Sequence, residues 1–470
     1  MNLEDTQPSY AISHHAELTP PPRWLFYSVV LVTIASILIP ISGIILFKDL
    51  LRPAQQQRVI NSLPFMVNFL PYRPDVDEMV PTAVAAEYDM SASDLLVVST
   101  DVPTATHTLT PTITPTNQVV AAPVETREPI QPTPTLFPTA TPSPTSPTEL
   151  SVSSEQVPPS ARLFGFSFEQ QTWNNCGPAS ITIALSYFGW REDQEYARQQ
   201  LRPDREDKNV TPDEMVAFVN QNTGIRSLWR SGGTLELVRK LVANGFPVIL
   251  GTGFMPEAYD WIGHYRTVVA YDSTYFYFYD SFMGTGTDNQ GYAVLADDVD
   301  QNWQHFNRRF IVLYTPEREE LLMQVLDDYA DVTLANGIAL KTAQQEARLN
   351  PQNAYAWFNL GTSLTHLERY EEAAVAFDRA RQTNLPWRML WYQFEPYRAY
   401  YEIERYDDVL ALVQANLNNG GQYVEETFYW QGRVYEAQSK LNEAKSAYQQ
   451  ALQLNVNYVQ AQEAINRITS

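Results

Sequence analysis

A tract rich in proline and threonine divides this chain of 470 residues into parts that must fold separately. It spans residues 102–150 and contains runs such as VPTATHTLTPTITPT and QPTPTLFPTATPSPTSPTEL. Proline fixes φ and has no backbone N–H, so no helix or sheet strand can continue through such a tract. We expect this tract to be extended and disordered and to act as a semi-rigid spacer. Tracts of this composition commonly serve as surface stalks, and a plain interdomain linker is the alternative.

The part before this tract contains a stretch long enough to cross a membrane. No charged residue occurs from Trp24 to Phe47, and Arg23 and Lys48 bracket the stretch. As a helix rising about 1.5 Å per residue, it can span a hydrocarbon layer of about 30 Å. It is longer than a usual signal-peptide h-region and lacks a clear small-x-small cleavage site. We therefore expect residues 24–47 to be a single transmembrane helix, with a cleaved signal peptide and a buried core helix as alternatives.

Two indications about the orientation of this helix disagree. Lys48, Arg52 and Arg58 lie on its C-terminal side, and the positive-inside rule would keep that side in the cytoplasm. Large domains translocate largely regardless of charge, however, and the stalk-like composition favours the other topology. We expect the C-terminal domains to be extracytoplasmic.

The composition argues against several classes of function. The net charge is −22, whereas phosphate contacts need clustered Lys and Arg, so we expect no nucleic-acid partner. One cysteine and two suitably placed histidines do not make a zinc site with the usual spacings. No glycine-rich phosphate loop occurs either. We expect neither a metal nor another cofactor.

The single cysteine, Cys176, lies immediately before a predicted helix. The run SITIALSYF has apolar residues at helical spacing, and Pro178 suits a first helical turn. The dipole and free N–H groups of a helix N-terminus stabilise an anion, so a thiol there should have a lowered pKa and be more nucleophilic. A small buried hydrophobe and an intermolecular disulfide are the alternatives for a lone cysteine.

A thiolate nucleophile needs an imidazole, and only His264 and His305 lie in the same ordered region. His264 begins HYRTVVAYD, which alternates like a strand, and YFYFYD follows after two residues. Two short strands joined by a tight turn predict a β-hairpin. Such a hairpin brings Asp280, at the end of the second strand, opposite His264, where its carboxylate could orient the ring. Asp280 could instead simply cap a turn.

Either of two adjacent glutamines could donate a hydrogen bond to the oxyanion that develops during the reaction. Gln170 lies six residues before Cys176, and its side-chain amide could act together with the Cys176 N–H. Gln171 is the competing assignment.

These motifs resemble the C39-like branch of the papain-like cysteine peptidases, from about residue 161 to about residue 316. The resemblance rests on Gln170-x5-Cys176-Gly177-Pro178-Ala179-Ser180, on Gly263-His264-Tyr265 and on Asp280-Ser281. It implies that Cys176 is the nucleophile, His264 the general base, Asp280 the orienting residue and Gln170 the oxyanion donor. The family often has Asp-Pro where this chain has Asp280-Ser281.

The pattern around these residues predicts an α+β domain. Residues 181–245 are mainly helical, with a capping box at Thr211 and Glu214 and a helix stop at Gly245. Strands are predicted at PVILG, HYRTVVAYD, YFYFYD and RRFIVLYT. Helices followed by antiparallel strands are typical of the α+β class.

The C-terminal residues are helical and resemble tetratricopeptide repeats, helix–turn–helix units of about 34 residues. One copy carries Trp357, Leu360, Gly361, Leu364, Tyr370, Ala373, Phe377 and Ala380. Another carries Phe428, Gly432, Tyr435, Leu441, Ala444, Tyr448 and Ala451. A degenerate copy lies between them, and a partial copy precedes Pro351. We expect an all-α solenoid whose concave face binds a protein partner, with a plain helical bundle as the alternative.

Together these features predict a multidomain membrane protein. Its parts are an N-terminal tail (1–23), a transmembrane helix (24–47), a membrane-proximal segment and stalk (48–160), a C39-like domain (161–318) and tetratricopeptide repeats (319–470). The predicted activity is hydrolysis of peptide bonds in a peptide or protein substrate. A catalytically silent peptide-binding scaffold and a papain-like cell-wall amidase or transpeptidase are the alternatives.

Overall fold

The computed structural model describes residues 23–47, 59–60, 63–69, 80–83, 90–96, 157–255, 261–383 and 385–469. The predicted stalk, the tail before residue 23 and most of the membrane-proximal segment lie outside these residues. The described residues fall into two compact units. One contains helix α1 (Arg23–Ile45) and the short 3-10 helix η2 (Pro64–Phe69), and the other contains everything described from residue 80 onward.

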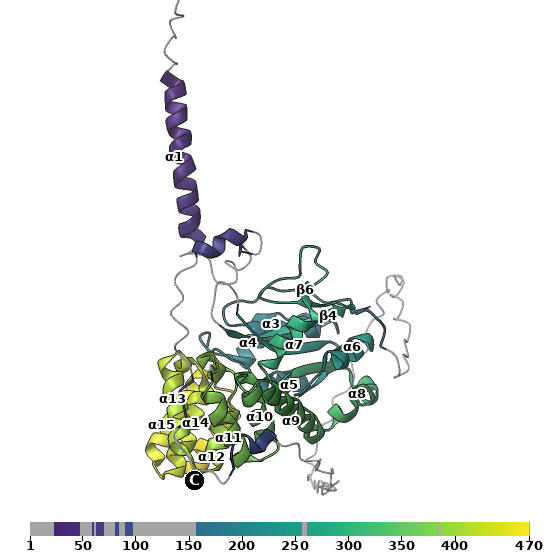
Figure 1. Cartoon of the computed structure of the whole chain (residues 1–470), viewed down its shortest axis with the longest axis vertical. Coiled ribbons are helices and arrows are strands. Elements are labelled where there is room, and N and C mark those ends of the chain that lie inside the picture. The colour runs from purple at the N-terminus through teal and green to yellow at the C-terminus, as the bar shows by residue number, and fades with distance from the viewer. Residues whose placement is uncertain are drawn as a thin grey trace, which may run out of the picture. The chain divides into compact units, whose positions relative to one another are not determined.

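The predicted membrane-spanning stretch is one continuous helix, α1 (Figure 1). Its segment Tyr27–Ile45 is 19 residues long and has a mean hydropathy of 2.4, and none of it is packed into a core. Pro40 lies inside the helix, a position that membrane helices tolerate. The helix is therefore long and apolar enough to cross a bilayer, although a signal sequence near an N-terminus would pass the same test.

The second unit begins with a domain built on one antiparallel sheet, which confirms the predicted α+β class. The sheet has the strand order β2-β7-β3-β4-β5-β6, and β1 also pairs with β4. The strands are β1 (Ala161–Arg162), β2 (Arg226–Arg230), β3 (Val248–Phe254), β4 (Ile262–Tyr271), β5 (Tyr275–Tyr279), β6 (Tyr292–Leu295) and β7 (Phe310–Tyr314). The predicted hairpin is formed by β4 and β5.

Helices cover both faces of this sheet because its central strands alternate between two apolar cores. Ile249 and Ile311 point into a core with α3 (Cys176–Ser186), α4 (Gln194–Leu201) and α5 (Pro212–Asn222). Val248 and Val312 point into a second core. That core is completed by α6 (Leu235–Ala243), α7 (Ala296–Gln304) and α8 (Glu319–Leu326).

Local capping chemistry sets two helix boundaries where the sequence predicts them. The Thr211 hydroxyl accepts from the Glu214 N–H (3.3 Å), and the Glu214 carboxylate accepts from the Thr211 N–H (2.8 Å). This reciprocal pair is the predicted capping box and starts α5. Helix α6 stops before Gly245, whose φ of +75° suits a residue without Cβ.

The sequence pattern does not predict β1, β2, β6 or α7. Strand β2 has the sequence RSLWR and lies at an edge of the sheet, paired only with β7. An edge strand is partly solvated, so its arginines need not interrupt it. Strand β6 is also an edge strand and has four residues, too few for alternation to be recognised.

The repeats form a run of paired helices, which Figure 1 colours from green to yellow. They are α9 (Val332–Leu349), α10 (Ala354–His366), α11 (Tyr370–Arg381), α12 (Glu395–Glu402), α13 (Tyr406–Asn418), α14 (Glu425–Ala437), α15 (Leu441–Leu454) and α16 (Val459–Thr469). The glycines allow close approach: a Cβ on Gly361 would meet the Phe377 ring at 2.7 Å, and one on Gly432 would meet Tyr448 at 2.5 Å.

The repeats pack against the α+β domain through buried polar contacts. Asn307 donates to the Ser363 hydroxyl (2.9 Å), and Asn359 donates to the Gln304 carbonyl (2.7 Å). Arg308 pairs with Glu346 across the same boundary (2.6 Å). Because these hydrogen bonds and this ion pair need specific donors and acceptors, they fix the register between the two domains.

Two short pieces of the region predicted as membrane-proximal segment pack on the repeats. Val80 and Leu95 are buried in the repeat core. Arg381 donates to the Pro81 carbonyl (2.7 Å), and Gln344 donates to the Leu95 carbonyl (2.9 Å). The core of the repeats therefore includes residues far before residue 319.

Candidate active site

Cys176 is the first residue of helix α3, whereas the sequence predicts that the helix begins just after it. The N–H of a first helical residue has no acceptor within the helix and is free to bind an anion. Two hydrogen bonds hold α3 against β4: Ser180 Oγ donates to the Tyr265 carbonyl (3.0 Å), and Thr267 Oγ1 donates to the Ser180 carbonyl (3.1 Å). Ser180 lies one helical turn after Cys176 on the same face, so these bonds direct the thiol toward His264.

The structure brings His264 and Asp280 together. His264 Nε2 lies 2.8 Å from Asp280 Oδ1, and both side chains are buried. Because Nε2 faces the carboxylate, Nδ1 is the ring nitrogen left for another partner. The Cys176 thiol interacts with the same imidazole: His264 lowers the pKa of the thiol, and Cys176 raises the pKa of the His264 ring. Cys176, His264 and Asp280 therefore form one connected series.

The turn after β5 stabilises the ionised form of the Asp280 carboxylate. Oδ1 also accepts from the N–H groups of Phe282 and Met283 (both 2.9 Å), and Oδ2 lies 3.1 Å from Arg266 Nε. Burial raises the pKa of Asp280, but His264, Arg266 and the Met283 N–H outweigh it and hold the pKa below its usual range. The carboxylate is thus ionised wherever the imidazole titrates.

The electrostatics favour an ion pair between sulfur and ring. Burial raises the pKa of the Cys176 thiol, but His264, the Tyr265 N–H and the Arg202 charge lower it, and the net direction is downward. Burial lowers the pKa of His264, whereas Asp280 and Cys176 raise it to about 9. A lowered thiol pKa and a raised imidazole pKa stabilise thiolate and imidazolium together.

The two glutamines considered for an oxyanion hole both contact the turn after Asp280. The Gln170 amide donates to the carbonyls of Ser281 and Phe282, which uses both of its N–H groups. Gln171 Oε1 accepts from Ser281 Oγ (2.9 Å), and the Gln171 N–H donates to the Ser281 carbonyl (3.0 Å). A proline at position 281 has no hydroxyl and could not make the contact with Gln171. Ser281 therefore adds a hydrogen bond that the Asp-Pro sequence of the family would lack.

Comparison with known proteins assigns families to two parts of the chain. Residues 165–311 match the profile described as the Peptidase_C39 like family. This domain is a C39-like peptidase domain. Residues 425–458 match a tetratricopeptide repeat, which confirms the prediction for the second clear copy. Both parts of the predicted resemblance are therefore confirmed.

A match among the solved structures covers about a third of the chain. It is a crystal structure of a candidate C39-like peptidase from Bacillus anthracis, 16% identical, with the alignment covering 33% of this chain and 98% of that chain. The TM-score is 0.28, so the assignment rests on the family profile. Among curated proteins, none matches this chain.

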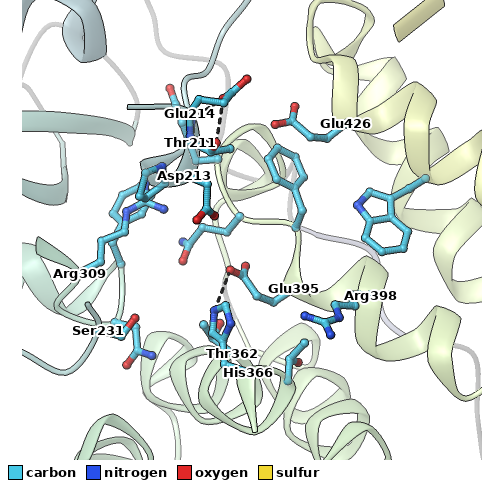
Figure 2. A pocket seen from close by; sticks show the side chains of 18 of the residues that line it. Thr211, Asp213, Glu214, Ser231, Arg309, Thr362, His366, Glu395, Arg398 and Glu426 are labelled. Atoms are coloured by element: carbon cyan, nitrogen blue, oxygen red, sulfur yellow. Dashed lines mark hydrogen bonds and ion pairs between the residues drawn. The ribbon is translucent and has the colours of Figure 1, made fainter. Parts of the chain in front are cut away.

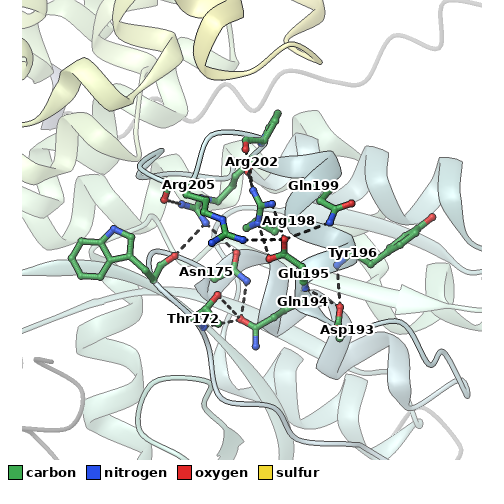
Figure 3. Close-up of polar contacts among 12 residues, drawn as sticks. Thr172, Asn175, Asp193, Gln194, Glu195, Tyr196, Arg198, Gln199, Arg202 and Arg205 are labelled. Carbon is green, nitrogen blue, oxygen red and sulfur yellow. Dashed lines mark hydrogen bonds and ion pairs between the residues drawn. The ribbon is translucent and has the colours of Figure 1, made fainter. Parts of the chain in front are cut away.

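A polar network that the sequence does not predict holds the segment before Cys176 (Figure 3). Gln194 Oε1 accepts from the Thr172 N–H (2.8 Å) and from Asn175 Nδ2 (2.7 Å). Arg202 is fully buried and donates to the Trp173 carbonyl (3.3 Å) and to Asn175 Oδ1 (3.1 Å). The C39-like domain thus fixes its nucleophile from α4 as well as from β4.

The other histidine of the C39-like domain has a different environment. His305 Nδ1 accepts from Trp261 Nε1 (3.1 Å), and the His305 ring stacks on Tyr355 at 3.9 Å. Burial lowers the pKa of His305 to about 4, so the ring is neutral at neutral pH. It contributes to the boundary with the repeats, which leaves His264 as the imidazole beside the thiol.

Proposed function

We propose that this chain is a membrane-anchored cysteine peptidase whose repeats bind a polypeptide partner or substrate. One observation carries the proposal: the Cys176 thiol lies at a helix N-terminus and interacts electrostatically with His264, whose ring is hydrogen-bonded to Asp280. This is the arrangement that activates a thiolate nucleophile. Membership of the C39-like family supports the same conclusion.

In the proposed reaction the Cys176 sulfur attacks the carbonyl carbon of a peptide bond. The carbonyl oxygen becomes an oxyanion, which the free N–H groups at the start of α3 stabilise. The His264 imidazolium donates its proton to the leaving amine as the C–N bond breaks, and a thioester forms. Neutral His264 then takes a proton from water, hydroxide attacks the thioester, and the carboxylic acid leaves as the thiolate is restored.

Asp280 acts in this scheme without exchanging a proton. Its carboxylate holds His264 through Nε2, so that Nδ1 faces the sulfur, and it stabilises the imidazolium. Helix α1 anchors the chain in the membrane, and the proline- and threonine-rich tract holds the C-terminal domains outside the cytoplasm. The α1 length and composition support the anchor, and the composition of residues 102–150 supports the stalk.

The proposal is tested by incubating the purified full-length chain in detergent with a complex peptide mixture and identifying new termini by mass spectrometry. Hydrolysis at defined sites supports a peptidase. Transfer of the acyl group to an added amine, with little hydrolysis, would instead indicate a transpeptidase. No covalent reaction with peptide substrates or with a peptide-based thiol probe would indicate a binding scaffold.

Single alanine variants of the two glutamines distinguish their roles. If Gln170 turns from its two carbonyl partners to the oxyanion, we expect Gln170→Ala to lower kcat by about 10²-fold or more while KM changes little. Gln171→Ala, the matched control, should then lower kcat less than about threefold. The reverse order would assign the oxyanion to Gln171. Equal small effects would mean that main-chain N–H groups suffice.

A further inference from the structure

A cavity of about 530 Å³ lies between the C39-like domain and the repeats (Figure 2). The N-terminus of α5 and the end of β2 line one side of it, and α10, α12 and α14 line the other. Cys176, His264 and Asp280 are not among its lining residues. The cavity is therefore a second candidate site, separate from the proposed active site.

One end of this cavity is acidic. Figure 2 shows the carboxylates of Glu214, from α5, and Glu426, from α14, turned toward each other, with Asp213 next to Glu214. Glu426 is 4% exposed, and its Oε2 has no hydrogen-bond partner among the described residues. Asn455 donates to Glu425 (2.8 Å) and to Glu214 (3.2 Å) but not to Glu426.

These carboxyls are close enough to oppose each other's ionisation. Burial and the charge of Glu425 raise the pKa of Glu214 to about 8. Burial and the charges of Glu425, Glu214 and Asp207 raise the pKa of Glu426 well above its ordinary value. Burying carboxyls together without a cation is unfavourable. A cation between them would remove that cost.

The arginines that line the cavity contact tyrosine and phenylalanine side chains instead of the carboxylates. Arg398 donates to the Tyr370 hydroxyl (2.8 Å), Arg433 lies over the Tyr401 ring at 4.4 Å, and Arg309 lies over the Phe306 ring at 4.2 Å. Within the described part of the chain, no basic side chain forms an ion pair with Glu214 or Glu426. Arg433 lies over the rings at this end but forms no ion pair with Glu214 or Glu426, so these two carboxylates can accept a further cation.

The walls beside Glu426 suit an organic cation. Tyr429, Trp430 and Tyr458 line the same end of the cavity, and the Tyr429 and Tyr458 rings lie 5.5 Å apart. Arg433 of this chain already lies over the Tyr429 ring at 5.8 Å and over the Trp430 ring at 5.9 Å, so these rings do accept a guanidinium group. Aromatic faces attract ammonium and guanidinium groups. In the residues that the structure describes, no group of His, Cys, Asp and Glu is arranged to hold a metal ion. Carboxylates beside aromatic rings therefore indicate a Lys or Arg side chain.

We propose that this cavity binds a lysine or arginine side chain of a polypeptide partner, with its cationic group between Glu214 and Glu426. The inference rests on the part of the proposed function that gives the repeats a polypeptide ligand, and not on hydrolysis. One basic side chain would then contact both domains, so binding would also stabilise their packing.

The test uses the full-length Cys176→Ala chain, so that no probe is cleaved, and isothermal titration calorimetry. The probes are acetyl-Ala-Ala-Lys-Ala-Ala-amide, its arginine counterpart and its Nε-acetyl-lysine counterpart. We expect the two basic peptides to bind at least about tenfold more tightly than the neutral one. At pH 7 binding should release protons from the carboxyls, so the apparent enthalpy should differ between buffers of different ionisation enthalpy.

Adding Glu426→Gln should weaken binding of the basic peptides about tenfold, whereas Glu443→Gln, on the exposed surface of α15, should not. Equal affinity for the basic and acetylated peptides would overturn the inference and leave polypeptide binding by the repeats intact. Absence of binding by both basic peptides, or binding that Glu426→Gln does not change, would also overturn it. Peptide hydrolysis is measured separately, so its failure would be recognised as such.

Discussion

Cys176→Ala should lower kcat/KM for peptide hydrolysis by at least about 10⁴-fold, to the level of the uncatalysed background. The variant removes one sulfur atom and leaves helix α3, with its free N–H groups, in place. The proposed mechanism has no other nucleophile, since Cys176 is the only cysteine of the chain. The measurement is kcat/KM on a fluorogenic peptide based on a cleavage site found in the digestion experiment.

The control for this variant is its thermal unfolding midpoint, which shows whether the variant is still folded. Cys176 is only partly buried, so we expect the thermal unfolding midpoint of Cys176→Ala to stay within a few degrees of the native value. A variant that unfolds normally but keeps more than about a tenth of the activity would show that Cys176 is not the nucleophile. That result would direct attention to a scaffold role, or to a different site.

His264→Ala should lower kcat/KM by about 10³-fold or more, because both the base and the positive partner of the thiolate are lost. Its reaction with iodoacetamide at pH 6 should slow at least about tenfold, as the thiol pKa returns toward that of an ordinary cysteine. Alkylation reports on Cys176 alone, since the chain contains one cysteine. Rates are followed by intact-protein mass spectrometry.

His305→Gln is the matched control for the second histidine of the C39-like domain. Glutamine can still accept a hydrogen bond from Trp261, which His305 accepts now. We expect this variant to keep hydrolysis and alkylation within about threefold of native. If His305→Gln and His264→Ala slowed alkylation equally, loss of His264 would act through general damage to the fold.

The part of the site that depends on short-range sequence patterns could be predicted. A helix start next to Cys176 follows from Pro178 and the apolar spacing after it, and the β4–β5 hairpin follows from two alternating runs joined by a short turn. Both are short-range patterns. The contact of His264 with Asp280 also depends on a β-bulge between Val268 and Ala270, which shifts the register so that Thr267 lies opposite Tyr279. The sequence pattern predicts the hairpin but not this bulge.

The parts that depend on long-range packing could not be predicted. Gln194 and Arg202 lie in REDQEYARQQLRP, which has the composition of a solvated helix, yet Arg202 is fully buried behind Cys176. A charged residue in such a run is normally exposed. Glu214 and Glu425 meet through Asn455, which lies 241 residues after Glu214. No local pattern in the sequence indicates these contacts.

The hydrogen-bond partners of Gln170 could not be predicted from the sequence either. Spacing from Cys176 favours it as an oxyanion donor, but spacing does not reveal that its amide faces the carbonyls of Ser281 and Phe282. Those carbonyls belong to the turn that also holds Asp280. Only the folded turn shows that Gln170 links the segment before the nucleophile to the loop that orients the imidazole.

The central claim is that Cys176 and His264 form a thiolate–imidazolium pair. The thiol pKa is lowered and the His264 pKa is raised to about 9, so the pair exists between these two values. As the pH rises through about 9, His264 loses its proton, and hydrolysis should fall because the leaving amine is no longer protonated.

The most direct test is the rate of alkylation of the native chain by iodoacetamide from pH 4.5 to 9.5. We predict a plateau that begins below the pH at which an unperturbed cysteine ionises, followed by a second rise near pH 9 as the imidazolium loses its proton. A single sigmoid with a midpoint at about 8.5, the value of an unperturbed cysteine, would contradict the ion pair and with it the proposed peptidase mechanism.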